Sequence, residues 1–220
     1  GLHFSYSNDD KPFLTLPHWN VQQGQKLFIQ GPSGCGKSTL LNLLTGVLVP
    51  NSGDIKVLGH SLQYMSSHQR DRFRAKHIGV VFQQFNLIPY LSVLDNIRLA
   101  VHFADRHLTP LEGRVKTLFE KLRVPEALLS RRADRLSVGQ QQRVAIVRAL
   151  INDPEIVVVD EPTSALDSDA TDAFMQILLG LCQEKGCALV FVSHDKSLAH
   201  YFDSSVCLKA ICELGVPDAD

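Results

Sequence analysis

The sequence predicts an α/β fold in which helices cover a parallel sheet, and three patterns support this. Residues 24–30 read as a strand, a glycine-rich loop follows, and residues 37–48 carry leucines at helical spacing. Residues 156–159 and 189–192 are short, apolar and rich in β-branched side chains, which is typical of strands buried on both faces of a parallel sheet. Residues 167–182 between them read as a helix, which completes a strand, helix, strand unit.

Short alternating runs near the start of the chain predict an antiparallel β subdomain beside this core. Apolar and polar residues alternate over 2–6 and 54–58. Turn-forming residues occupy 8–10 and 51–53.

From about residue 92 to residue 152 the apolar residues follow a helical period instead. One helical face there contains Leu111, Val115, Leu118 and Leu122. An inserted helical subdomain is therefore expected at about 92–152, and the α/β core at about 1–91 and 153–220. No internal repeat or linker-like tract divides the sequence, so residues 1–220 are predicted to form a single domain.

Composition argues against several classes of protein. The chain has 22 Lys and Arg against 23 Asp and Glu, so it has no charge excess to hold nucleic acid or an anionic membrane. Its apolar runs, such as 188–192, are far shorter than the roughly 18–20 residues that span a bilayer. The first residues lack the basic start and apolar run of a signal peptide, so export of this chain is not expected.

Five cysteines, an odd number, predict reduced thiols rather than a disulfide framework. Cys182 and Cys187 have the same spacing as Cys207 and Cys212, which could be read as four zinc ligands. Structural zinc usually has the tighter C-x-x-C spacing. Packing as small apolar side chains is therefore the preferred interpretation.

Residues 31–38 fit the phosphate-loop pattern G-x-x-x-x-G-K-[ST] and lie between a predicted strand and a predicted helix, the context that this loop requires. Backbone N–H groups of such a loop surround the phosphates of a nucleotide, and the helix dipole favours the anion. Lys37 would contact the β- and γ-phosphate oxygens, and Ser38 would ligate Mg²⁺. The residues predicted to bind nucleotide here are Gly31, Pro32, Ser33, Gly34, Cys35, Gly36, Lys37, Ser38 and Thr39.

Asp160 and Glu161 follow the apolar run 156–159, so they would face the crevice where open α/β sheets bind ligands. Asp160 suits the outer shell of the Mg²⁺ ion, beyond its direct ligands, and Glu161 suits polarising an attacking water. The alternative is a solvated acidic turn before Pro162, and the buried strand that precedes the pair argues against it.

These motifs resemble those of the nucleotide-binding subunit of an ABC transporter, and the likeness covers essentially the whole chain. The matching segments are 31–38 with Walker A, Gln83 with the Q-loop, 156–161 with Walker B, 164–167 with the D-loop and His194 with the switch histidine. The resemblance implies a P-loop NTPase with a RecA-like parallel-sheet core that binds ATP and Mg²⁺ and hydrolyses ATP. It also makes Gln83 a catalytic residue and a Mg²⁺ ligand.

Residues 136–140 resemble the family signature LSGGQ, with Val138 in place of the middle glycine. Ser137 and Gln140 also form a capping-box pattern ahead of a helix at 141–150, which would present N–H donors and a positive dipole end outward. Taken alone, the pattern is better explained as an ordinary helix cap. Because the same chain also contains Walker A and Walker B motifs, we interpret this segment as the family signature.

In the family, the signature of one subunit covers the ATP that is held by Walker A of the other. The resemblance therefore implies a two-fold homodimer around two ATP molecules. Ser137, Gly139 and Gln140 would bind nucleotide in this dimer, and Asp167 would cross its interface.

Two further nucleotide contacts are implied by the resemblance. His194 would contact the γ-phosphate and help to hold Glu161 and a water in place. Tyr6 would stack on adenine, although core packing and the nearby Phe4 and Phe13 are alternatives.

Residues 83–93 are unusually apolar for a loop, which a partner surface would explain. In transporters this region forms the groove for a cytoplasmic helix of the membrane subunit. The alternative is that its apolar side chains only anchor the helical subdomain. The resemblance thus implies an integral membrane permease as a partner, no nucleic acid, and a place at the cytoplasmic face of the bacterial inner membrane.

Residues 64–82 and 85–89 look like the bacterial lipoprotein-releasing and macrolide-exporting group, which favours export or lipoprotein release. That group includes cell-division homologues that signal through a membrane partner without transport, and this alternative stays open. A soluble ABC ATPase that acts on nucleic acid or ribosomes is less favoured, because the chain has a single cassette. A small P-loop kinase would need neither Gln83 nor the signature.

Overall fold

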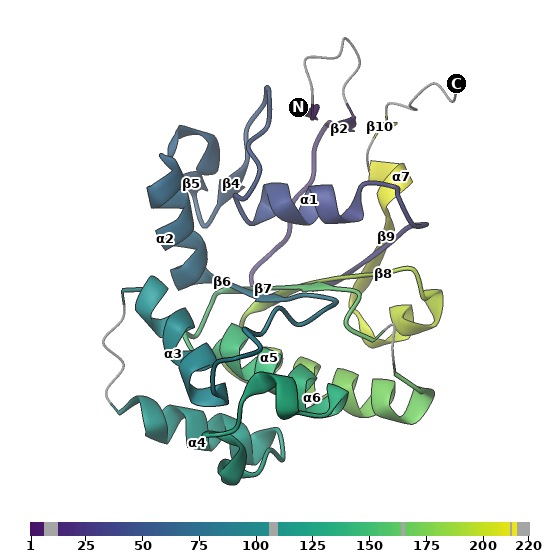
Figure 1. Cartoon of the computed structure of the whole chain (residues 1–220). Helices are drawn as coiled ribbons and strands as arrows, with labels where there is room; N and C mark the ends of the chain where they lie inside the picture. Colours follow the sequence, from purple (N-terminus) through teal and green to yellow (C-terminus); the bar gives the residue numbers. More distant parts are fainter. Residues whose placement is uncertain (7–12, 106–109, 164–165, 212, 215–220) are drawn as a thin grey trace.

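The computed structural model describes residues 1–6, 13–105, 110–163, 166–211 and 213–214, and a parallel sheet of five strands lies at its centre (Figure 1). The order across the sheet is β6 (Ile78–Val81), β7 (Ile156–Asp160), β8 (Ala188–Ser193), β3 (Lys26–Gln30) and β9 (Ser204–Cys207). The strands predicted at 24–30, 156–159 and 189–192 are confirmed, and they are the three inner strands. Their carboxyl ends lie at one edge, because every pairing in the sheet is parallel.

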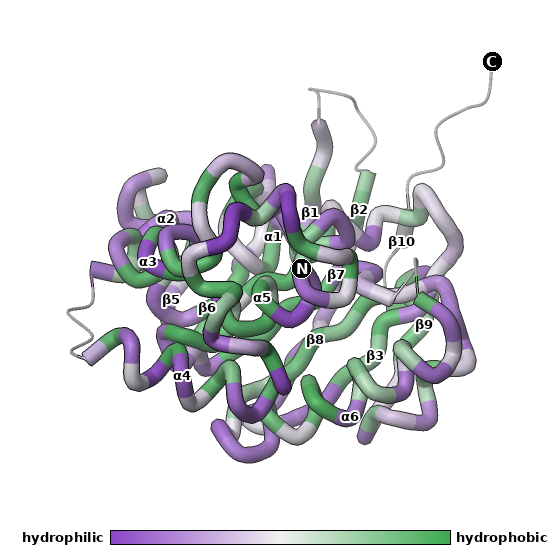
Figure 2. The backbone as a smooth tube through the Cα atoms, turned by 60° about the horizontal axis from the view of Figure 1, so that its bottom comes forward, coloured by the Kyte–Doolittle hydropathy of each residue, from purple (hydrophilic) through white to green (hydrophobic). Residues whose placement is uncertain are grey.

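Side chains of the inner strands alternate between two apolar layers. The layer toward α1 (Lys37–Leu44) contains Leu27, Ile29, Val158, Val190 and Val192. The layer toward α5 (Val138–Leu150) and α6 (Ser168–Lys185) contains Phe28, Val157, Val159, Leu189 and Phe191. Figure 1 shows α1 on one face of the sheet and α5 and α6 on the other, and Figure 2 shows hydrophobic segments gathered inside around β8 and α5. Each strand is apolar on both faces, so its sequence does not alternate.

Two helices differ in length from the prediction, and local backbone explains both differences. The helix predicted over 37–48 ends at Leu44, because Gly46 with φ +70° turns the chain. The helix predicted over 167–182 begins at Ser168 and continues to Lys185, where Gly186 in the left-handed region ends it.

The described residues between 92 and 152 are mainly helical, as the sequence predicts. They contain α3 (Val93–Phe103), α4 (Leu111–Lys121) and α5, with short 3₁₀ turns at Glu126–Leu128 and Ala133–Arg135. Helix α5 packs on the sheet, and its buried side chains join the same core as β7 and β8. The limits of a separate helical subdomain stay a prediction.

The antiparallel part consists of two small sheets. One has the order β1 (Leu2–Phe4), β2 (Leu14–Leu16) and β10 (Glu213–Leu214), so its third strand comes from the far end of the chain. The other pairs β4 (Lys56–Val57) with β5 (His60–Ser61), and α2 (Ser67–His77) follows it. A single bridge between His3 and Ser52 links the first strand to the turn at 51–53, while the predicted turn at 8–10 lies outside the described residues.

Cys182 and Cys187 are buried at the C-terminal end of α6, where the amide of Cys187 donates to the carbonyl of Cys182 at 3.1 Å. Cys207 is half-buried, and Cys212 lies outside the described part of the chain. Within that part, no three His, Cys, Asp or Glu side chains are grouped as a metal site.

Candidate functional site

The glycine-rich loop between β3 and α1 has a backbone that only glycine adopts easily. Gly34 and Gly36 have φ of +76° and +90°, and Gly36 caps the start of α1 without a side-chain hydrogen bond. A Cβ at Gly31 would lie 2.5 Å from the Sγ of Cys35. The first amides of α1 are thus left for an anion, and an approaching phosphate would meet backbone rather than side chains.

Lys37 is buried inside this loop. Its Nζ donates to the carbonyl oxygens of Gly31 and Pro32, each at 2.9 Å. The same Nζ lies 3.2 Å from Oε1 of Glu161, and the two side chains are only 6% and 17% exposed. The loop therefore holds its ammonium group at the carboxyl edge of the sheet, where β7 ends.

Contacts with Val192 and His194 and an unusual backbone conformation define the position of Glu161. Its amide donates to the carbonyl of Val192 at 2.9 Å, which extends the pairing of β7 with β8 by one residue. Its Oε2 lies 3.0 Å from Nδ1 of His194, and its φ of +43° is in the left-handed region. A non-glycine residue in that region is strained, and such strain is characteristic of functional sites.

Ser38 and Asp160 form a second oxygen pair beside this cluster, where the hydroxyl of Ser38 donates to Oδ2 of Asp160 at 3.3 Å. Burial is the main cause that raises the pKa of Asp160 above its ordinary value, and the neighbouring Glu161 adds to it. The Ser38 hydrogen bond and Lys37 oppose that rise. A half-buried carboxylate and a hydroxyl suit a hard divalent cation such as Mg²⁺, whose charge would favour the ionised carboxylate.

Gln83 lies in the turn that follows β6, and its side chain is exposed. Because Val81 pairs with Val159 in register, this turn leaves the sheet at the same edge as Asp160 and Glu161. The parallel sheet thus brings the Q-loop residue to the side of the molecule where the Walker residues gather.

Tyr6 is tied to the start of α1. Its hydroxyl lies 2.6 Å from Oγ1 of Thr39, and its ring meets the rings of Phe4 and Phe13 edge-on at 4.9 and 5.4 Å. Phe4 is buried at 5% exposure, whereas Tyr6 is 65% exposed. Tyr6 therefore offers a ring to a ligand beside the phosphate loop, and Phe4 belongs to the core.

The signature segment is placed elsewhere. Ser137 accepts from the amide of Gln140 at 3.3 Å and Gln140 accepts from that of Ser137 at 3.0 Å, so the predicted capping box is present. The helix begins at Val138, earlier than the predicted residue 141, and the side chain of Val138 is 51% exposed. Nothing lies within 4 Å of a Cβ built on Gly139. This helix covers the face of the sheet opposite to α1, so one chain does not bring its signature to its own phosphate loop (Figure 1).

Asp167 caps α6, and its side chain accepts from the amide of Ala170 at 2.8 Å. The side chain is also exposed, which leaves it accessible to another molecule. The first two residues of the D-loop match, Ser164 and Ala165, lie outside the described residues.

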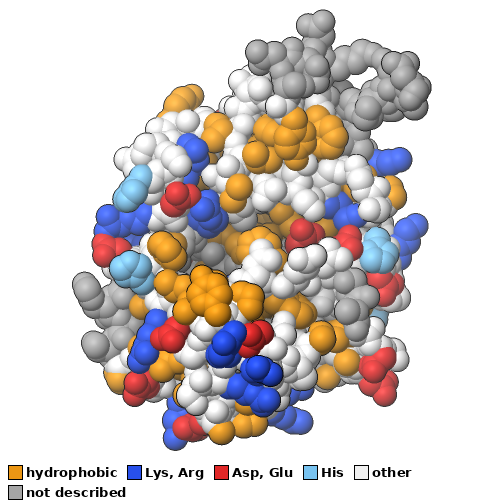
Figure 3. All heavy atoms as spheres, in the orientation of Figure 1, with side chains coloured by type: hydrophobic (Ala, Val, Ile, Leu, Met, Phe, Trp, Pro, Cys, Tyr) orange, Lys and Arg blue, Asp and Glu red, His pale blue; other side chains and the backbone are white. Residues whose placement is uncertain are grey.

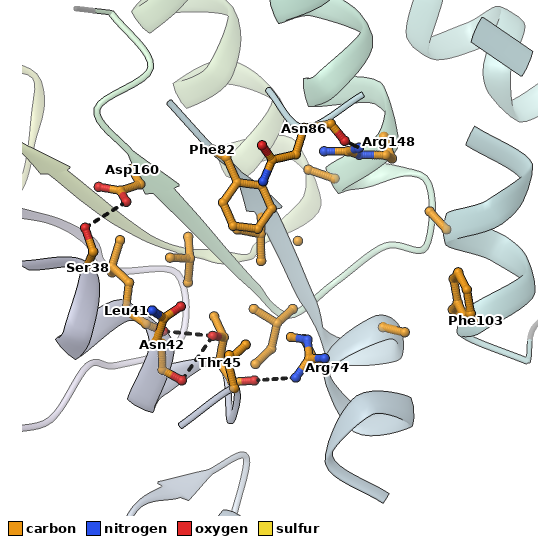
Figure 4. Close-up of a pocket in the computed structure, with 18 residues that line it drawn as sticks. Ser38, Leu41, Asn42, Thr45, Arg74, Phe82, Asn86, Phe103, Arg148 and Asp160 are labelled. Atoms are coloured by element: carbon orange, nitrogen blue, oxygen red, sulfur yellow. Dashed lines mark hydrogen bonds between the residues drawn. The ribbon is translucent and has the colours of Figure 1, made fainter. Parts of the chain in front are cut away.

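A cavity of about 560 Å³ opens beside the Ser38–Asp160 pair. Figure 4 shows this pair at one end and Phe103 of α3 at the other, with Arg74, Phe82 and Arg148 between them. On the face shown in Figure 3, hydrophobic side chains surround a hollow between α1 and α3. The cavity wall combines α1, α2, β6, α3 and α5, which are far apart in sequence, so no local pattern predicts Arg74, Phe103 or Arg148 at this site.

Whether 83–93 forms a partner surface stays a prediction, and the structure shows how its apolar side chains are placed. Phe85 is buried at 7% exposure and belongs to the core, and of that range only Asn86 lines the cavity. The exposed apolar side chains at the cavity are Val47, Phe82 and Phe103, at 54%, 36% and 63% exposure.

Residues 14–164 match the family model for ABC transporter domains. The chain belongs to the ABC transporter family. It is 41% identical to an uncharacterised ABC transporter ATP-binding protein of Methanocaldococcus jannaschii, over 93% of this chain and 91% of that protein. It is 35% identical to the lipoprotein-releasing system ATP-binding protein LolD of Chromohalobacter salexigens, over 88% of this chain and 81% of LolD.

Solved structures agree with this cassette fold. The ATP-binding cassette MJ0796 of M. jannaschii, in a dimeric post-hydrolysis state with ADP and Pi, superposes with a TM-score of 0.83 at 34% identity, over 94% of this chain and 91% of that one. The chain is thus an ATP-binding subunit of the ABC transporter type and an ATPase with a P-loop NTPase fold.

Proposed function

We propose that two copies of this cassette bind Mg-ATP head to tail and that hydrolysis drives a membrane partner in export or in lipoprotein release. The observation that carries this proposal is the cluster around Glu161, which lies 3.2 Å from Lys37 and 3.0 Å from His194. A carboxylate held between a cation and an imidazole, next to a phosphate loop, suits the orientation of a water for attack on the γ-phosphate.

Each site residue of one chain has a separate role in binding or hydrolysing ATP. The amides of the loop and Lys37 hold the phosphates, and Tyr6 stacks on the adenine. Ser38, Asp160 and Gln83 would hold Mg²⁺, and this ion would neutralise charge on the phosphates. Glu161 accepts a hydrogen bond from the attacking water, and His194 keeps Glu161 in place. The water oxygen forms a bond to the γ-phosphorus, the bond from that phosphorus to the β–γ bridging oxygen breaks, and the products are ADP, phosphate and the proton that the water gives up.

The signature requires a second copy. Ser137, Gly139 and Gln140 start a helix on the opposite face of the sheet from α1, so they reach a nucleotide only when another chain presents one. Asp167 then lies at the interface between the copies. The dimeric state of MJ0796, a similar cassette, supports this arrangement.

The cavity is the best candidate for docking of the membrane partner. The cavity runs from the Ser38–Asp160 pair to the exposed ring of Phe103. A segment bound in it would therefore contact residues of the nucleotide site. Its exposed apolar rim suits the apolar face of a helix. Within the described residues, no helix is long and apolar enough to cross a bilayer. The cassette would therefore reach the cytoplasmic face of the inner membrane through this partner.

The 35% identity with LolD of C. salexigens supports lipoprotein release or export as the process that ATP hydrolysis drives. A cell-division type of cassette, which signals without transport, has the same catalytic parts and is the second candidate. The identity of the membrane protein bound at the cavity decides between the two.

Two measurements test the proposal. Purified protein with Mg-ATP should release phosphate to water, and phosphate transfer to an acceptor without hydrolysis would instead indicate a kinase. In cell membranes, the wild type and Tyr64→Asp should retain an integral membrane protein, whereas Phe103→Asp should lose it. Tyr64 is a matched control because it is 84% exposed and does not line the cavity. Retention by all three would contradict docking at this cavity.

A further inference from the structure

The turn that carries Gln83 ends in two strained residues. Phe85 and Asn86 have φ of +57° and +48°, so two consecutive non-glycine residues lie in the left-handed region. The amide of Asn86 donates to the carbonyl of Gln84 at 2.6 Å, and that of Phe85 to the carbonyl of Phe82 at 3.0 Å. Residues with a side chain are strained in this region, so other contacts must hold the turn.

Arg148 supplies those contacts from α5. Its Nη1 donates to the carbonyl of Asn86 at 2.5 Å and its Nη2 to the carbonyl of Phe85 at 2.6 Å. Figure 4 shows the guanidinium group beside Asn86 at the cavity wall. Burial lowers the pKa of Arg148 from its ordinary value, and within the described residues no carboxylate forms an ion pair with it. The two carbonyl oxygens are therefore the groups that compensate its charge.

The same helix begins at the signature. Arg148 is ten residues after Val138, the first residue of α5, so about 15 Å of helix separates the Arg148 backbone from the start of the signature helix. Most of α5 is buried, and a close-packed interior transmits a displacement instead of absorbing it. A shift of the Phe85 and Asn86 carbonyls would therefore move Ser137 as well.

We infer that Arg148 is a positioning residue that joins the Gln83 turn and the signature helix into one unit, so that one subunit's Mg-ATP site and the signature that it presents to the other are set together. The inference rests on the proposed function, since it assigns a coupling role inside the same ATP-driven dimer. In this role Arg148 acts through the carbonyl groups of Phe85 and Asn86.

Arg143 provides a matched control. It lies on the same helix and its Nη1 also donates to a backbone carbonyl, that of Arg123, at 3.4 Å. Arg123 follows α4 and has a φ of +52°, so this contact too holds a left-handed residue. It does not reach the Gln83 turn.

The test compares Arg148→Met, Arg148→Lys and Arg143→Met, each alone and with Glu161→Gln, which is expected to trap the ATP-bound dimer. The measurements are the melting temperature, the binding of a fluorescent ATP analogue to the monomer, the ATP concentration for half-maximal dimer formation, kcat and KM. Losing one charge-assisted hydrogen bond changes an equilibrium by roughly ten- to a hundredfold.

We expect Arg148→Met to bind nucleotide as a monomer within about twofold of wild type, while dimer formation weakens and kcat falls about tenfold or more, with KM changed less than about threefold. Arg148→Lys, which reaches only one carbonyl, should give about half the effect on a logarithmic scale. Arg143→Met should stay near wild type in all but melting temperature.

Equal dimer formation and turnover in Arg148→Met and Arg143→Met would overturn the inference. So would a loss of monomer nucleotide binding in step with stability, because that indicates only a structural role. If Arg148→Met does not fold, Arg148→Lys provides the test. Dimer formation and turnover equal to wild type in Arg148→Lys would then overturn the inference. A Glu161→Gln parent that stays monomeric in saturating Mg-ATP would instead contradict the proposed dimer, and the kcat and KM of the single variants would still report on Arg148.

Discussion

Helices α1 and α5 both begin at a sequence motif associated with phosphate, and they begin in opposite ways. The first has Gly36 as its cap, with φ +90° and no side-chain hydrogen bond, and the buried Lys37 and the half-buried Asp160 lie beside it. The second has a complete capping box from Ser137 and Gln140. The start of α1 is thus built to receive an anion within its own chain. The start of α5 is already capped by side chains of its own chain, and its exposed end can contact another molecule.

The largest expected effect comes from the charge at the start of α1. Lys37→Ala removes the ammonium that contacts the Gly31 and Pro32 carbonyls and Glu161. We expect hydrolysis to fall roughly a hundredfold or more, because a preorganised cation is lost from a buried phosphate site. Phosphate release at saturating Mg-ATP measures this, and unchanged turnover would show that the loop is not the site.

The capping box at α5 should be needed for activity beyond its part in folding. Ser137→Ala removes one cap, at a cost of about 1 kcal/mol of unfolding free energy, and should lower hydrolysis about tenfold or more. Ser66→Ala is the control, since Ser66 and Gln69 form the same capping box at α2. The two variants should lose similar stability in urea unfolding, but only Ser137→Ala should lose ATPase activity. Equal activities would make the α5 box a simple cap.

The half-buried carboxylate of Asp160, beside α1, should lower the stability of the fold when it is ionised. Because burial raises the pKa of Asp160, the folded state binds this proton more tightly than the unfolded chain does. Protonated Asp160 therefore contributes stability at low pH. This contribution is lost as the pH rises from 3.8, the ordinary pKa of an aspartate, through the raised pKa of Asp160. Without Mg²⁺ or nucleotide, Asp160→Asn should unfold at a higher temperature than wild type at pH 7, with a smaller gain near pH 4. A lower melting temperature at pH 7 would contradict this, and the variant should still lose hydrolysis.

Val138 should have the smallest effect. Its half-exposed side chain stands at the first position of α5, where the family signature has glycine. Val138→Gly should strengthen ATP-dependent dimer formation by a few-fold, equivalent to about 1 kcal/mol or less, because less bulk then lies in front of the helix start. Sedimentation in the Glu161→Gln background measures it, and weaker association would show that the valine contributes contacts.

The parts that the sequence could predict are those fixed by neighbours in the chain. The phosphate loop between β3 and α1, the apolar inner strands and the Ser137–Gln140 capping box all depend on local spacing. The end of α1 was missed, because one residue, Gly46, overrides the helical leucine pattern that continues to Leu48.

The contacts that could not be predicted join distant segments. Lys37 meets Glu161 because β3 and β7 both flank β8 in the parallel sheet. Arg148 reaches Phe85 and Asn86 because α5 packs under the edge of that sheet, and its sequence context gives no sign of this. Phe103 lines the cavity for the same reason, since its partners come from α1, α2 and β6. Residue pattern alone does not fix such packing.

Subunit mixing tests most directly that the two helix starts work in different chains. Glu161→Gln and Ser137→Ala should each have strongly reduced hydrolysis, but a mixed dimer pairs the intact phosphate loop and Glu161 of one chain with the intact signature of the other. We predict that mixing the monomers before Mg-ATP is added restores phosphate release to as much as about a quarter of wild type, since random pairing makes half of the dimers mixed and each has one complete site. A mixture no more active than its two components would contradict the shared site.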